Sequence, residues 1–101
     1  MPQNELHIDV MQLRKAKMIL RAINHKLRQQ MLKLIHDNQK MNVTSIYTKL
    51  DIEQSVASQH LAILRTAGFV KTERHERQIF YFVNYDRVNE VQKHSQQLID
   101  Q

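Results

Sequence analysis

The decisive stretch of this chain reads Ser-Gln-His-Leu-Ala-Ile-Leu-Arg-Thr-Ala-Gly-Phe-Val over residues 58–70. Extended back to Gln54, it spaces its apolar residues as one face of a helix requires. These residues are Ala57, Leu61 and Leu64. Gly68, the only glycine of the chain, stands where a helix end favours a left-handed backbone. The stretch therefore predicts a helix from 54 to 67 that ends at Gly68.

The pattern changes after this glycine. Residues 69–74 and 78–83 are rich in β-branched and aromatic side chains, and the polar residues 75–77 join them, which predicts a β-hairpin. Before residue 54, the stretch 44–50 predicts a short helix whose apolar face packs across the helix at 54–67. Two helices joined by a tight turn and followed by a basic hairpin form a winged helix-turn-helix.

Working outward, helical spacing predicts a first helix over 6–22 and a second that ends near Asp37, with Asn24 as its N-cap. We expect Val43 to form a short strand residue and Thr44 to cap the third helix. A last helix is predicted over 85–100. The expected fold is thus mainly α with a small β-hairpin, in the order α-α-α-α-β-β-α, within a single domain over 1–101.

Composition limits the function. Lys and Arg number 15 against 10 Asp and Glu, which gives a formal net charge of +5. A basic balance in a small domain favours a polyanionic partner, of which nucleic acid is the commonest. The chain has no cysteine, so it forms no disulfide and no thiolate metal site. We expect no signal peptide, no membrane span and a cytoplasmic location.

An enzyme is not expected. One glycine cannot build a glycine-rich phosphate loop, and Ser58 and His60 stand two positions apart on a helix, where side chains do not face each other. No carboxylate pair falls in an evident apolar pocket. We therefore expect no catalytic site and no cofactor.

The side chains predicted to face outward on the 54–67 helix are small and polar at its start and positive further along. Such a helix can enter the major groove, where Gln can bond adenine at two points and Ser can bond bases or phosphate. Arg at a hairpin tip can reach the minor groove or a phosphate. A solvated surface is the alternative interpretation of both segments. The candidate DNA-binding residues are Gln54, Ser55, Ser58, Gln59, Arg65, Lys71, Arg74, Arg77 and Gln78.

Residues 22–83 resemble the ArsR/SmtB-type winged-helix regulators. Residues 58–70 match that family's pattern of Ser, any residue, His-Leu, two more residues, Leu, and then Ala-Gly-Leu-Val. Further matches are Arg28 with Met31-Leu32 upstream and Ile79-Phe80-Tyr81 downstream. Within this motif His60 is expected to position the backbone and to donate a hydrogen bond to phosphate, which adds it to the candidate DNA-binding residues.

The resemblance implies a homodimer, held through the helices at 6–22 and 85–100, that presents two recognition helices to a palindromic operator. It divides the chain into these dimerisation helices, the helix-turn-helix at 44–67 and the wing at 69–83. The chain departs from the family at Glu76, where a Gly usually forms the wing turn, so the wing tip is expected to be longer or less tight. Glu53 also replaces the usual Ser before the recognition helix.

Many such regulators sense metal through cysteines of the third helix or Asp and His pairs of the last helix. The first set is absent. For the second set the chain offers only Asp86, Glu90 and His94, spaced as one helix face. The paired-His pattern near the C-terminus is missing, and a solvated helix face is the preferred interpretation, so no metal site is predicted.

The predicted function is a sequence-specific transcriptional regulator of double-stranded DNA, most simply a repressor. The sequence identifies no inducer and does not tell whether one exists. The alternative is a winged-helix module that binds protein and does not read DNA. RNA is disfavoured because few exposed aromatic side chains are available for stacking on bases.

Overall fold

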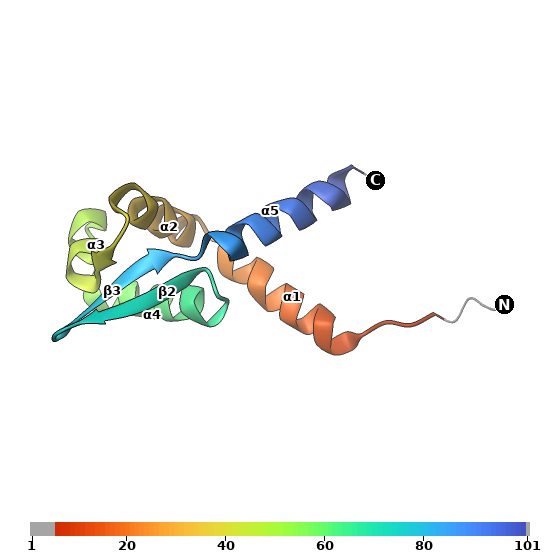
Figure 1. Ribbon diagram of the computed structural model, residues 1–101, viewed down its shortest axis with the longest axis horizontal. Helices are drawn as coiled ribbons and strands as arrows, with labels where there is room; N and C mark the ends of the chain where they lie inside the picture. The colour runs from red at the N-terminus through yellow and green to blue at the C-terminus, as the bar shows by residue number, and fades with distance from the viewer. Residues whose placement is uncertain (1–5, 101) are drawn as a thin grey trace.

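The computed structural model describes residues 6–100, which form five helices and a small sheet (Figure 1). In chain order the elements are α1 (Val10–Ile23), α2 (Lys26–Asn38), β1 (Met41–Asn42), α3 (Val43–Leu50), α4 (Gln54–Thr66), β2 (Val70–His75), β3 (Gln78–Val83) and α5 (Tyr85–Ile99). This order confirms the predicted winged helix-turn-helix, in which α3 and α4 are the paired helices and β2 and β3 form the wing.

The sheet has three antiparallel strands in the order β1-β3-β2. In the wing, Val70 pairs with Val83 at the base and His75 with Gln78 at the tip. The short strand β1 adds to the other edge of β3, where Met41 faces Tyr81. Strand β1 fixes the wing to the helices, because it pairs with β3 and leads directly into α3.

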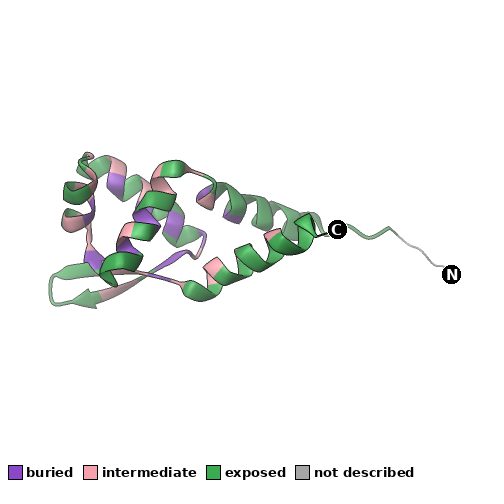
Figure 2. Ribbon diagram, turned by 90° about the horizontal axis from the view of Figure 1, so that it is seen from above, coloured by how far each residue is buried: buried purple, intermediate pink, exposed green. Residues whose placement is uncertain are grey.

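The core lies between the sheet and helices α2, α3 and α4 (Figure 2). Its largest fully buried side chains are Phe69, Met31, Ile35, Ile46, Leu61 and Leu64. The predicted contact of the third helix with the fourth is confirmed, since Ile46 of α3 and Leu61 of α4 are both fully buried and Leu50 packs against the same cluster. The core therefore sets the angle at which α4 presents its outer face.

Helices α1 and α5 extend away from this core toward the same end of the molecule (Figure 1). Helix α5 has no buried residue, and α1 buries only Ile19 and Ala22. Large apolar side chains remain exposed on both helices and on the segment before α1. They are Leu6, Ile8, Val10, Met11, Leu13, Met18, Leu20, Tyr85, Leu98 and Ile99. Within residues 6–100, no helix has the length and apolar character needed to cross a membrane.

Several element boundaries differ from those predicted. Helix α1 begins at Val10 and not at residue 6, because the Asp9 carboxylate accepts a hydrogen bond from the Gln12 amide at 3.1 Å and so caps the helix there. Asn24 is the C-cap of α1, and His25 takes the N-cap position of α2 without a side-chain cap bond. The N-cap prediction for Asn24 is therefore wrong.

The predicted start of the third helix is also wrong. Val43 is helical, and Asn42 rather than Thr44 is the N-cap, with its side-chain oxygen accepting from the Ser45 amide at 2.8 Å. Strand β1 ends at Asn42, one residue before the predicted strand position. The same asparagine thus ends a strand and begins a helix.

The wing turn is tight, which contradicts the expectation of a longer tip. His75 belongs to β2 and pairs with Gln78, so only Glu76 and Arg77 form the turn. Glu76 adopts a φ of 58°, the left-handed conformation that glycine would adopt without cost. Gly68 has a φ of 84°, which confirms the predicted left-handed end of α4.

Candidate nucleic-acid interface

The outer face of α4 carries the first group of candidate residues. Ala57, Leu61 and Leu64 are fully buried, and this anchors the opposite face of the helix in the core. The exposed residues are Gln54, Ser55, Ser58, Gln59 and Arg65. The structure thus brings these five candidate DNA-binding residues together on one exposed helix, polar at its N-terminal end. Ala62, also predicted to face outward, is exposed as well.

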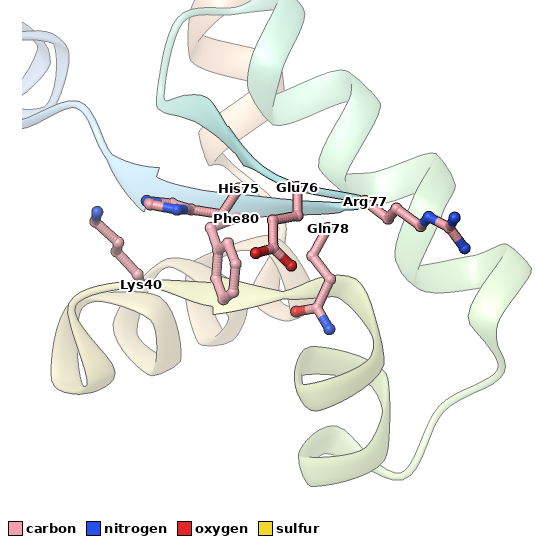
Figure 3. A pocket seen from close by; sticks show the side chains of 6 residues that line it. All are labelled: Lys40, His75, Glu76, Arg77, Gln78 and Phe80. Atoms are coloured by element: carbon pink, nitrogen blue, oxygen red, sulfur yellow. The ribbon is translucent and has the colours of Figure 1, made fainter.

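The wing candidates are all exposed but do not share one face. Successive residues of a strand point to opposite faces. Arg74 shares the face of the buried Val70, whereas Lys71 and Gln78 lie on the other face. Figure 3 shows Arg77 pointing away from the side chains gathered on that second face. Arg74 and Arg77 therefore project differently from Lys71 and Gln78.

A network that the sequence analysis did not identify fastens the wing. The Glu73 carboxylate contacts Lys40 Nζ at 2.9 Å and His75 Nε2 at 3.3 Å. The hydrogen bond and charge of Lys40, reinforced by His75, lower the pKa of Glu73 below its usual value. Asn42 also donates to the Gln78 side-chain oxygen at 3.1 Å. These bonds join β2 and β3 to residues around β1 that are distant in the sequence, so no local sequence pattern predicts them.

The wing network borders a shallow cleft near the tip (Figure 3). Its lining residues are Lys40, His75, Glu76, Arg77, Gln78 and Phe80. The His75 imidazole meets the Phe80 ring edge-on, with ring centroids 6.1 Å apart. The hydrogen bond from Asn42 holds the exposed side chain of Gln78, whereas Arg77 makes no side-chain hydrogen bond or ion pair within residues 6–100.

His60 differs from the other α4 candidates because it is half-buried on the flank of the helix. Its ring centroid lies 4.8 Å from that of His25, at the start of α2. Desolvation lowers the pKa of His60, and the charges of His25 and Arg28 lower it further. The structure thus groups His60 with α2, a contact between residues 35 positions apart that sequence reasoning missed.

The metal-ligand candidates Asp86, Glu90 and His94 are exposed along α5. Glu90 lies 3.7 Å from the Arg87 guanidinium, which engages its carboxylate. Within the part of the chain that the structure describes, no group of three or more His, Asp or Glu side chains gathers as metal ligands would. The three residues do not form a closed ligand set within one chain.

Comparison with known protein sequences finds similarity to transcriptional regulators. The family model described as "Bacterial regulatory protein, arsR family" matches residues 25–72. An uncharacterised HTH-type transcriptional regulator of Methanocaldococcus jannaschii is 38% identical over 79 residues, which cover 78% of this chain and 89% of that protein. The transcriptional activator HlyU of Vibrio cholerae is 35% identical over 74 residues, covering 73% of this chain and 68% of that protein.

Solved structures agree with this assignment. The transcriptional repressor PagR of Bacillus anthracis superposes with a TM-score of 0.69 at 28% identity, covering 84% of this chain and 97% of that one. A homodimeric winged helix-turn-helix DNA-binding domain of Mycobacterium bovis superposes with a TM-score of 0.76 over 98% of this chain and 91% of that one; at 20% identity this likeness shows the fold alone. The protein belongs to the arsR family of transcriptional regulators.

Proposed function

We propose that this regulator binds a palindromic operator in double-stranded DNA as a homodimer and represses transcription from it. The observation that carries the proposal is the exposed polar face of α4, which the core holds beside a basic wing. In this arrangement the N-terminal part of α4 enters the major groove, and Gln54, Ser55, Ser58 and Gln59 meet base edges there. Arg65, Lys71, Arg74 and Arg77 contact phosphates or the neighbouring minor groove.

Homodimerisation is supported by the apolar surface left on α1 and α5. The two helices border a groove whose apolar lining includes Ile19, Leu20 and Val91. Large apolar side chains beside this groove have no cover within the described chain, and a protein of 101 residues has little core of its own. The M. bovis domain of the same fold is described as homodimeric.

Repression is the simpler direction of control, because a bound dimer can block transcription without a further contact. PagR is named a repressor and HlyU an activator, so relatives of this chain act in both directions. The sign of regulation is therefore tested separately, by fusing the bound promoter to a reporter and removing the regulator. Higher reporter output in its absence supports repression, and lower output contradicts it.

The main experiment is selection of bound sequences from a random duplex pool. We expect two inverted half-sites whose centres lie about 34 Å apart, or a multiple of this, because a two-fold dimer places its recognition helices in successive major grooves. Recovery of a single half-site would contradict the dimeric geometry. Recovery of no enriched sequence would contradict sequence-specific binding.

Salt distinguishes DNA binding from the alternative of a protein-binding module. Each phosphate neutralised by Lys or Arg releases counterions, so the logarithm of affinity falls linearly with the logarithm of salt concentration. We expect a steep negative slope for the selected duplex. An absence of duplex binding even at low salt would favour the protein-interaction module.

We also propose that the signal to which this regulator responds is not a metal held by the ligands usual in the family. The chain has no cysteine, and Glu90 is engaged by Arg87. Affinity for the selected duplex is expected to be the same with a chelator and with added Zn²⁺. A large loss of affinity on adding Zn²⁺ would contradict this.

A further inference from the structure

Three basic side chains meet where α2 begins beside the flank of α4. The rings of His25 and His60 are in contact and tilted by 51° to each other, and Arg28 lies close enough for its charge to act on His60. The Nδ1 atoms of both imidazoles and the Nε atom of Arg28 are buried without a hydrogen-bond partner. Buried polar groups are normally paired, so these inner nitrogens show that the three side chains are not held by internal hydrogen bonds, and only their outer nitrogens remain to meet a partner.

The charges that act on His60 are those of two basic groups, His25 and Arg28. The sequence contains no Asp or Glu between Asp9 and Asp37, nor between Glu53 and Glu73. Asp37 pairs with Lys33 at the far end of α2, and Glu73 of β2 pairs with Lys40 and His75. Helices α1, α2 and α3 and strand β2 thus bring no unpaired carboxylate to the cluster, and the acid nearest to it on α4 itself is the N-cap Glu53, about two turns before His60. The exposed charges nearest along the chain, Arg21 and Lys26, are also basic.

We propose that His25, Arg28 and His60 form a binding site for one backbone phosphate of duplex DNA, and that filling this site takes up a proton. The inference rests on the proposed function, which places α4 in the major groove. His60 follows Gln59 directly, so it lies about 100° around the helix from a base-reading position. The flank of a helix seated in the groove faces the sugar-phosphate backbone.

The chemistry of the cluster suits a phosphate rather than a base. An arginine and two imidazoles supply only donors when the imidazoles are protonated, and phosphate oxygens are acceptors. The Nε2 atoms of the imidazoles and the terminal nitrogens of Arg28 are not among the buried, unpaired atoms, and no hydrogen bond within residues 6–100 occupies them. These atoms are therefore available to a phosphate at the surface.

Proton uptake follows from the free protein's electrostatics. Burial and neighbouring positive charge favour the neutral form of His60, which keeps its pKa below 6.5. A phosphate beside the ring favours the charged form and raises that pKa. DNA affinity therefore increases as the pH falls from above the bound-state pKa to the free-state pKa, by at most about tenfold per pH unit for each proton taken up.

The test measures the dissociation constant of a short mixed-sequence duplex, and of the selected duplex, from about pH 6 to about pH 8 at constant ionic strength. For the wild type we expect affinity to rise severalfold toward the lower pH with both duplexes. His60→Gln is expected to flatten this dependence, and His25→Gln to reduce it. His36→Gln, at the other end of α2, is the matched control and is expected to retain the wild-type profile.

A second measurement requires no variant and so is independent of folding defects. NMR titration of the wild-type imidazoles, free and bound to the mixed-sequence duplex, is expected to show a higher pKa for His60 in the complex. An affinity that does not change with pH, or a His60 pKa that DNA does not raise, overturns the site and leaves the proposed function intact. Absence of binding to any duplex overturns both.

Discussion

Gly68 ends α4 with a left-handed backbone and lies under the side chain of Arg87. A Cβ added at Gly68 would stand 3.0 Å from Arg87 Nε and 3.2 Å from a terminal guanidinium nitrogen. Gly68→Ala therefore combines a strained φ of 84° with displacement of an arginine from α5. We expect a loss of about 1–2 kcal/mol in the free energy of unfolding, measured by urea denaturation.

A double-mutant cycle with Arg87→Ala separates these two causes. In the Arg87→Ala background the added methyl group meets no guanidinium, so only the backbone strain remains and the cost of Gly68→Ala is expected to be smaller. Equal costs in both backgrounds would show that the arginine simply moves aside. No cost in either would contradict the left-handed conformation.

Gln59 and Arg77 are expected to contribute to DNA binding in different ways. Gln59 is exposed on the outer face of α4, where a bidentate bond to adenine discriminates between bases by about 1–3 kcal/mol. Arg77 stands at the wing tip, where a contact to phosphate carries no base information. Gln59→Ala should change the sequences selected from a random pool, while Arg77→Ala should weaken binding to all duplexes and reduce the salt dependence.

The comparison uses one selected and one random duplex for each variant. Equal losses on both duplexes for Gln59→Ala would contradict its base-reading role. A loss confined to the selected duplex for Arg77→Ala would assign base contact to the wing instead.

Among the elements, the wing is joined to the residue before β1 by the ion pair that Glu73 makes with Lys40 at 2.9 Å. Because the folded protein holds the pKa of Glu73 below 4.5, the unfolded chain binds its proton first. The pair's contribution to stability is complete above the unfolded-state pKa and is lost as the pH falls through the folded-state pKa. Glu73→Gln should therefore make the free energy of unfolding less sensitive to pH as the pH falls below about 5.

Urea denaturation at a series of pH values measures this effect. Glu76→Gln is the matched control, because it removes an acid from the adjacent turn, where the structure shows no ion pair. The control should retain the wild-type pH dependence. If Glu73→Gln retains it as well, the carboxylate does not fasten the wing.

Local patterns predicted the elements well where one residue decides the geometry. Gly68 ends α4 because few other residues adopt its backbone, and the apolar spacing of α4 correctly assigned its buried face. Strand β1 has no such signal, because it exists only through pairing with β3. The start of α1 was misplaced because the apolar residues before it continue the helical spacing, while the Asp9 cap interrupts it.

The candidate site also has features that local sequence patterns predict and features that depend on contacts between distant residues. The outer face of α4 could be predicted from helical spacing alone, since exposure follows from the burial of the opposite face. The contact of His25 with His60 and that of Lys40 with Glu73 join distant parts of the chain. Such pairs depend on how α2 packs on α4 and how β1 aligns with the wing, which a single sequence does not encode locally.

At the scale of the whole molecule, the exposed apolar side chains of α1 and α5 lead to a prediction about the dimer. A substitution that prevents dimerisation through these helices should also weaken DNA binding. Leu13 is 59% exposed on α1, beside the other uncovered apolar residues of that helix. Leu13→Glu would place a charge in the proposed interface, where burying it without a partner costs several kcal/mol. At 1.4 kcal/mol per tenfold change, we expect the dimer to weaken by about a hundredfold or more.

Sedimentation equilibrium measures the association, and duplex binding is measured on the same samples. Gln30→Glu, which adds the same charge at an exposed position of α2, is the matched control and should remain dimeric. Because each subunit supplies one recognition helix, a monomeric Leu13→Glu protein should bind a single half-site and lose the advantage of the palindrome. A Leu13→Glu protein that remains dimeric would place the interface elsewhere. One that is monomeric yet binds the palindrome at wild-type affinity would show that the two half-sites are read independently.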